Sequence, residues 1–94
     1  MKYSGGISLL DEYIIEAVKI KRKEAGISQA ELSTLMDLND KYIGAVEGKT
    51  VETKYNLNHL NKIAEILDCS IADFLHKTYL KNNYIKKSKK SKKN

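Results

Sequence analysis

Apolar residues recur every three or four positions along most of this chain, which is the spacing of amphipathic helices. The first such stretch runs over 9–24, where the apolar positions fall on one face. Ser8 and Asp11 form a capping-box pattern at its start, and Gly26 follows its end. The pattern therefore predicts a first helix over 9–24.

Residues 28–48, SQAELSTLMDLNDKYIGAVEG, contain two further short amphipathic segments separated by a turn. Ser28 and Glu31 form a second capping-box pattern, which predicts the start of the first of these helices. Asp37 ends it, because aspartate tolerates the left-handed backbone conformation that such turns need.

The second segment is predicted as a helix over 39–47 that begins near Asn39, a residue suited to capping. Ile43 and Val46 are spaced to point inward, and the residues between them point elsewhere. Two short helices joined by about four residues form a helix-turn-helix, a motif that inserts its second helix into the major groove of DNA.

Two more helices are predicted after residue 55. Asn56 caps the first of them, and Ser70 with Asp73 opens the second, which we expect to continue through Tyr79 and Leu80. The apolar stripe of the first comprises Leu57, Leu60, Ile63, Ala64 and Leu67.

Three blocks, IKRKEAGISQAELS, DKYIGAVEGK and LNKIAEILDCSIADFL, occur in an order that resembles the lambda repressor and Cro-like (XRE-type) helix-turn-helix domains. The resemblance runs from about Glu12 to His76. It implies an all-α, compact five-helix domain, which the helix pattern places over 9–80. The composition predicts a flexible terminus over 1–8 and a lysine-rich, disordered tail over 81–94. The family usually has a glycine where this chain has Asp37.

The resemblance also implies which side chains meet DNA. Lys41 is expected to donate to guanine, and Ala45 to touch a thymine methyl. Asp40 either accepts from cytosine or interacts with the helix dipole. The full base-reading set is Asn39, Asp40, Lys41, Gly44 and Ala45.

Phosphate contacts are expected from Gln29, Tyr42, Lys49, Thr50, Thr53 and Lys54. For Tyr42, packing over the seam between the second and third helices is an equal alternative. Arg22 and Glu47 match a partly buried ion pair of the family, which would tie the recognition helix to the first helix.

Charge is distributed unevenly along the chain. Residues 1–76 carry nine Lys and Arg against twelve Asp and Glu, whereas residues 77–94 carry eight lysines and no acid. The net charge of +5 therefore comes from the tail and not from the helical region. The tail is either a solvated segment or an arm that binds phosphates without sequence preference.

Other classes of function find no support in the sequence. His59 and His76 lack partners at metal-ligand spacing, so neither a metal nor a cofactor is expected, and no nucleophile or phosphate-loop motif suggests an enzyme. The single Cys69 excludes an internal disulfide and is expected to fill the core. With no apolar run near 20 residues and no signal peptide, we expect a cytoplasmic protein without a membrane partner.

The sequence therefore predicts a sequence-specific double-stranded DNA-binding protein, most simply a repressor. One domain of this size contacts few bases, so a homodimer is expected. Its interface is predicted to comprise Phe74, Leu75, Tyr79 and Leu80. The alternatives are an antitoxin that also binds a toxin protein and a DNA-packaging protein that binds through its tail.

Overall fold

The computed structural model describes residues 7–49 and 53–81, and every regular element in these ranges is helical. The four α-helices are α1 (Leu9–Glu24), α2 (Gln29–Leu35), α3 (Tyr42–Gly48) and α4 (Leu57–Leu67). A 3-10 helix, η1 (Ile71–Phe74), follows them. The all-α fold is therefore confirmed. Within the described part, no helix is long and apolar enough to cross a membrane.

Side-chain caps set the starts of α1, α2 and α4. Ser8 Oγ accepts from the Asp11 N–H at 3.0 Å, and Asp11 Oδ2 accepts from the Ser8 N–H at 3.2 Å, so the first predicted box is complete. At α2 the structure forms half of the predicted box, in which Ser28 Oγ accepts from the Glu31 N–H at 3.0 Å. The starts of these capped helices therefore follow from local chemistry that the sequence already displays.

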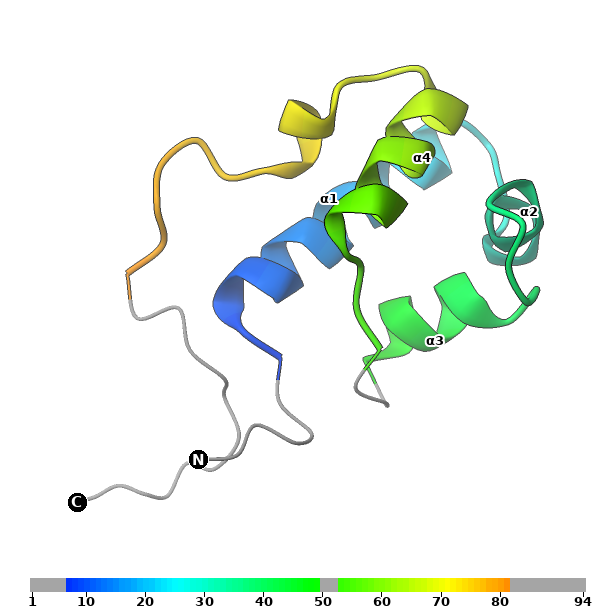
Figure 1. The fold of residues 1–94 in the computed structure, drawn as a ribbon, viewed down its shortest axis with the longest axis horizontal. Coiled ribbons are helices and arrows are strands. Elements are labelled where there is room, and N and C mark those ends of the chain that lie inside the picture. The colour runs from blue at the N-terminus through cyan, green and yellow to red at the C-terminus, as the bar shows by residue number, and fades with distance from the viewer. Residues whose placement is uncertain (1–6, 50–52, 82–94) are drawn as a thin grey trace.

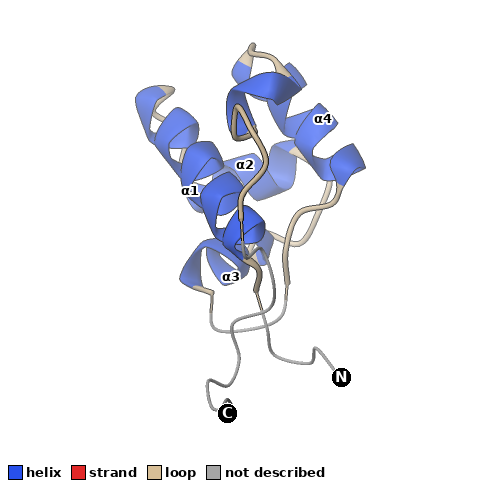
Figure 2. Ribbon diagram, turned by 90° about the vertical axis from the view of Figure 1, so that its left-hand side faces the viewer, coloured by secondary structure: helices blue, strands red, loops and turns tan. Residues whose placement is uncertain are grey.

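The core is built from all four α-helices and η1, which pack around one buried cluster. Figure 1 shows how α1 to α4 are arranged around it. The buried cluster comprises Val18, Leu32, Met36, Ile43, Leu60, Ile63, Ala64 and Phe74. In both Figure 1 and Figure 2, α3 lies at the lower edge of the molecule. One side of α3 therefore packs on the core, and the other side is left to solvent.

Asp37 takes the left-handed conformation predicted for it, with φ of 65°. Lys49 and Asp68, which follow α3 and α4, also have positive φ, at 57° each. Gly26 ends α1 with φ of 73°, a value that glycine adopts without a steric penalty.

The predicted fifth helix is a single 3-10 turn, and its extension through Tyr79 and Leu80 is wrong. Leu75 has extended backbone angles, φ −105° and ψ 147°, which end the turn at once. The Nδ1 atom of His76 lies 2.9 Å from the Thr78 carbonyl oxygen and 3.3 Å from the Thr78 nitrogen, so the His76 side chain bonds to the backbone of Thr78 where a helix would place a backbone hydrogen bond. The rings of Tyr13 and His76 pack edge to face, with centroids 5.0 Å apart, and this contact fixes the extended segment on α1.

Candidate nucleic-acid interface

The turn between α2 and α3 places three polar side chains at the exposed start of α3. Asn39 Oδ1 accepts from the Lys41 N–H at 2.8 Å, and the Asn39 carbonyl accepts from the Tyr42 N–H at 2.9 Å. Asn39 therefore closes a turn and does not cap the helix, so α3 begins at Tyr42 and not at the predicted 39. The prediction of the helix start was wrong for this reason.

Asp40 and Lys41 are exposed, and among the described residues neither forms an ion pair or a side-chain hydrogen bond. The Asn39 side chain is also exposed, and its amide N–H groups remain available because only its oxygen is used by the turn. These three side chains offer two donors and one acceptor of the kind that read base edges.

Behind this turn the outer side of α3 carries only small residues. Gly44 and Ala45 are half-buried, and Gly48 is exposed at the end of the helix. A Cβ at Gly44 would lie 3.1 Å from Gln29 Oε1, which is closer than ordinary contact. The glycine at position 44 therefore leaves room for the Gln29 side chain of α2.

Arg22 and Glu47 form the bidentate pair that ties α3 to α1. Arg22 Nε donates to Glu47 Oε2 at 2.8 Å, and Nη2 donates to Oε1 at 2.9 Å. The side chains are only 8% and 2% exposed, and the hydrogen bond to Glu47 raises the pKa of Arg22. Arg22 also donates to the Ile27 carbonyl at 2.7 Å. This geometry holds the end of α3 at a fixed distance from α1.

Gln29 joins the same cluster. Its Nε2 donates to Glu47 Oε1 at 2.9 Å, so one of its two amide N–H bonds is used inside the protein. The other N–H remains for the phosphate contact that the sequence predicts. This link to Glu47 gives Gln29 a structural role that the sequence did not indicate.

Tyr42 anchors the start of α3 on the opposite side. Its hydroxyl donates to the Lys54 carbonyl at 3.1 Å and lies 3.1 Å from His59 Nδ1, and its ring packs near that of Tyr55. Burial raises the pKa of Tyr42. Because its single proton is used by Lys54, the packing alternative describes its geometry better than a phosphate donor does.

The remaining predicted phosphate contacts lie around the end of α3. Lys49 and Lys54 are exposed and form long ion pairs with Glu16 and Asp11, each at 3.4 Å. Both lysines can exchange these weak partners for phosphates. Thr53 is half-buried, and Thr50 lies outside the described residues.

Two residues that hold the helices around the site were missed from the sequence. His59 completes the cap of α4, because its Nδ1 accepts from the Asn56 N–H at 3.2 Å while Asn56 Oδ1 accepts from the His59 N–H at 2.7 Å. Ser33 is fully buried on α2 and bonds to the backbone of α3. The signal in the sequence that could have revealed them is a polar residue at a helix position that faces inward.

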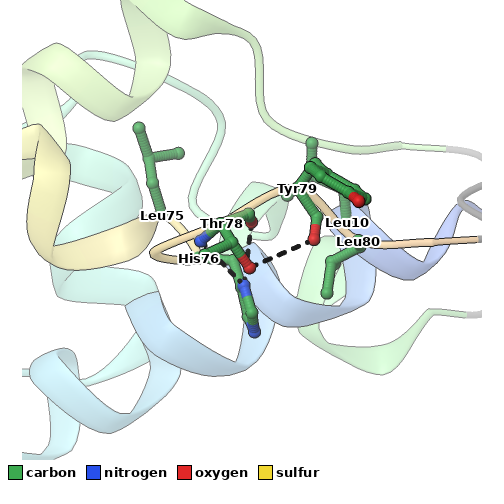
Figure 3. A pocket seen from close by; sticks show the side chains of 6 residues that line it. All are labelled: Leu10, Leu75, His76, Thr78, Tyr79 and Leu80. Carbon is green, nitrogen blue, oxygen red and sulfur yellow. Dashed lines mark hydrogen bonds between the residues drawn. The ribbon is translucent and has the colours of Figure 1, made fainter.

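The predicted dimer interface needs one correction. Phe74 is 0% exposed and belongs to the core, so it supplies no surface to a second protein copy. Leu75, Tyr79 and Leu80 instead line a surface pocket of about 400 Å³, together with Leu10 of α1 and the polar residues His76 and Thr78 (Figure 3). Tyr79 is 79% exposed, so this apolar surface faces solvent.

The other residues singled out from the sequence do not form a chemical site. Cys69 is a free cysteine that packs partly buried against the core. Over residues 7–49 and 53–81, no three His, Cys, Asp or Glu side chains come together in a way that could hold a metal ion.

Solved structures share this arrangement. A hypothetical transcription factor, NHTF, from Neisseria is 27% identical, with a TM-score of 0.62 over 71% of this chain and 75% of that one. The restriction-modification controller protein C.AhdI from Aeromonas hydrophila is 25% identical, with a TM-score of 0.58 over 67% of this chain and 92% of that one. Both are regulatory proteins by their descriptions.

The same fold also occurs within a longer enzyme. Hydroxypropylphosphonic acid epoxidase from S. wedmorenis is 22% identical, with a TM-score of 0.61 over 71% of this chain. The match spans only 35% of the epoxidase chain, and at this identity it shows the fold alone. No curated protein sequence matches this chain.

A family model decides the assignment. The model of the Cro/C1-type helix-turn-helix DNA-binding domain matches residues 18–76, which contain α2, the turn, α3, α4 and most of the core. The lambda repressor and Cro-like resemblance is thereby confirmed. This protein belongs to the Cro/C1-type helix-turn-helix DNA-binding domain family.

Proposed function

We propose that this protein is a sequence-specific transcriptional regulator that reads the major groove of double-stranded DNA with the turn and first residues of α3. One observation carries the proposal. Asn39, Asp40 and Lys41 project from the exposed start of a firmly anchored recognition helix, with polar groups left over for a ligand.

The chemistry of these groups defines the contacts we propose. Lys41 donates to guanine O6 or N7, and Asp40 accepts from cytosine N4. The small residues Gly44 and Ala45 let α3 approach the bases, with the Ala45 methyl against a thymine methyl. Gln29 with its remaining N–H binds a phosphate.

Lysines complete the phosphate contacts that orient the domain. Lys49 and Lys54 flank the end of α3 and are proposed to bind the backbone, where they exchange their long carboxylate contacts for phosphate oxygens. The lysine-rich tail holds the excess of positive charge, since the helical region is mildly acidic. The tail is therefore proposed to bind phosphates and to add affinity without sequence preference.

The experiment uses the full-length chain and a duplex selected by it from a random 30-base-pair library, with a scrambled duplex of the same composition for comparison. Fluorescence anisotropy gives both affinities in 0.15 M salt. We expect Lys41→Ala to lose about 5- to 150-fold in preference for the selected duplex, which corresponds to about 1–3 kcal/mol. The control Lys62→Ala removes an equal charge from α4, where Lys62 pairs with Glu65, and leaves the preference unchanged.

A selection that enriches no sequence would refute the proposal. It would direct attention to a protein partner such as the toxin of the antitoxin alternative. Equal losses for Lys41→Ala and Lys62→Ala would instead show that Lys41 contributes only its charge.

We further propose that the protein acts as a homodimeric repressor. The apolar rim formed by Leu10, Leu75, Tyr79 and Leu80 is the surface that a second copy would cover. Sedimentation equilibrium between 1 and 100 μM is expected to show dimers for the natural chain and a weaker dimer for Tyr79→Ser. The control Leu57→Ser removes an exposed leucine outside this surface. A monomer throughout this range would refute the dimer.

Repression follows if the bound protein covers a promoter element. In transcription with purified polymerase, a promoter carrying the selected site is expected to lose activity as the protein is added. A promoter with the scrambled site serves as the control. Increased transcription would show an activator.

A further inference from the structure

The start of the recognition helix is bonded to a side chain of a different helix. Ser33 on α2 is 0% exposed, and its Oγ accepts from the backbone N–H of Ile43 in α3 at 3.0 Å. The same hydroxyl donates to the Gln29 carbonyl at 2.9 Å, so the hydroxyl acts both as a donor and as an acceptor. Ile43 is also 0% exposed, so its N–H is shielded from bulk water and depends on an acceptor within the protein.

This bond replaces a cap that α3 lacks. The first N–H groups of a helix have no partners within the helix and usually bond to a capping side chain. In α3 the capping position is Lys41, whose side chain makes no such bond. The Tyr42 N–H bonds to the Asn39 carbonyl, and the Ile43 N–H depends on Ser33. Ser33 therefore acts as the cap of a helix to which it does not belong.

The same pair of helices is bonded again at the other end of α3. Gln29 of α2 donates to Glu47, which Arg22 of α1 also holds. A helix of seven residues is too short to be stable by itself, so its position depends on these attachments. Since Gln29 accepts from Ser33 and donates to Glu47, one continuous hydrogen-bonded path connects both ends of α3 to α2.

We propose that Ser33 is a positioning residue for DNA recognition, which fixes the start of α3, and with it Asn39 to Lys41, relative to α2. The inference rests on the proposed sequence-specific function. Base-edge hydrogen bonds need donor–acceptor distances of about 2.7–3.2 Å, so a small displacement of this turn removes them. Phosphate contacts by flexible lysines tolerate the same displacement. Loss of the Ser33 bond should therefore reduce sequence preference more than total affinity.

The test compares Ser33→Ala with Ser70→Ala in the full-length chain. Ser70 is the matched control, because its Oγ also accepts a backbone N–H, at 3.0 Å, but in η1. Binding is measured by anisotropy with the library-selected duplex and its scrambled counterpart at 15 °C. For Ser33→Ala we expect at least a 5-fold smaller ratio of the two affinities, with the scrambled duplex bound within 2-fold of the natural chain. For Ser70→Ala we expect an unchanged ratio.

Amide hydrogen exchange in the free protein checks the physical cause. We expect the Ile43 N–H to exchange at least 10-fold faster in Ser33→Ala, whereas the amides of α4 keep their protection. Ser33→Cys keeps a weaker acceptor and gives an intermediate ratio, and this variant decides the test if Ser33→Ala does not fold.

An unchanged ratio alongside faster Ile43 exchange would overturn the inference, since Ser33 would then only stabilise the fold. An unchanged ratio with unchanged exchange would overturn it as well. A natural chain that prefers neither duplex would refute the proposed function itself, and this outcome is seen before any variant is measured.

Discussion

The buried pair of Arg22 and Glu47 offers the sharpest test of how the recognition helix is held. Arg22→Ala removes two charge-assisted hydrogen bonds to Glu47 and one to the Ile27 carbonyl. It leaves the Glu47 carboxylate, 2% exposed, with Gln29 as its remaining side-chain donor. Stranding a buried charge in this way costs about 3–5 kcal/mol of the free energy of unfolding.

The size of this loss can be compared with the stability of the whole domain. At about 0.05–0.15 kcal/mol per residue, the roughly 70 described residues give about 4–10 kcal/mol. Arg22→Ala is therefore expected to unfold partly at 25 °C and to bind DNA poorly for that reason. Glu47→Ala strands Arg22 and should cost a similar amount.

A double-mutant cycle separates the pair from its surroundings. The double variant of Arg22→Ala and Glu47→Ala strands no charge, so we expect its loss to fall below the sum of the single losses by up to about 3 kcal/mol. Urea unfolding at 10 °C, followed by circular dichroism, measures each free energy. Single losses below about 1 kcal/mol, or an additive cycle, would refute the reasoning. The control Lys62→Ala breaks an exposed pair and should cost less than about 1 kcal/mol.

Four more outcomes are expected. Tyr55 has a buried hydroxyl without a hydrogen-bond partner among the described residues, so Tyr55→Phe should stabilise the fold by up to about 1 kcal/mol. Tyr42→Phe loses the bond to the Lys54 carbonyl and should cost about 0.5–1.5 kcal/mol, so the urea midpoints of the two variants should shift in opposite directions. Burial raises the pKa of Tyr55, so the folded state favours the neutral hydroxyl. The free energy of unfolding should therefore keep this contribution below about pH 10 and lose it as the pH rises toward the folded-state pKa. Tyr55→Phe should remove this loss in urea titrations above about pH 10. Asp37→Gly places glycine at a φ of 65° and should raise the melting temperature by several degrees, and an unchanged value would show that Asp37 is unstrained. A chain ending at Leu80 lacks seven lysines, so the slope of log affinity against log salt should become shallower by up to about 6, and an unchanged slope would exclude the tail from phosphate binding.

Local chemistry made much of the fold predictable. The caps at Ser8, Ser28 and Asn56 each bond to a backbone N–H three residues further along the chain. Both partners of each bond therefore lie within one short stretch of sequence, where a local pattern predicts them. The left-handed turn at Asp37 is local in the same way. The family resemblance supplied the pairing of Arg22 with Glu47, which are 25 residues apart.

Where local signals compete with tertiary contacts, the sequence was misleading. The capping box at Ser70 is present, but it starts only one turn, because the burial of Phe74 and the packing of His76 on Tyr13 direct the chain along α1. Spacing alone could not show that Phe74 fills the core and does not face a partner. Asn39 likewise is a residue type that often caps helices, but here its side chain closes the turn before α3.

The contacts that hold α3 are separate from the groups proposed to read DNA, and this separation has a consequence for specificity. Ser33 and Glu47 are buried, so a change at either position is expected to disturb the attachment of α3 and, through it, the groups proposed to read DNA. Asp40 and Lys41 are exposed and make no side-chain contact among the described residues, so their replacement costs little stability. Because the outer side of α3 carries only small residues, it offers few hydrogen-bond donors or acceptors to DNA, and its proposed part is to let the helix come close to the bases. Sequence preference in this domain should therefore depend mainly on the turn before α3, where it can change while the helix that supports it stays in place.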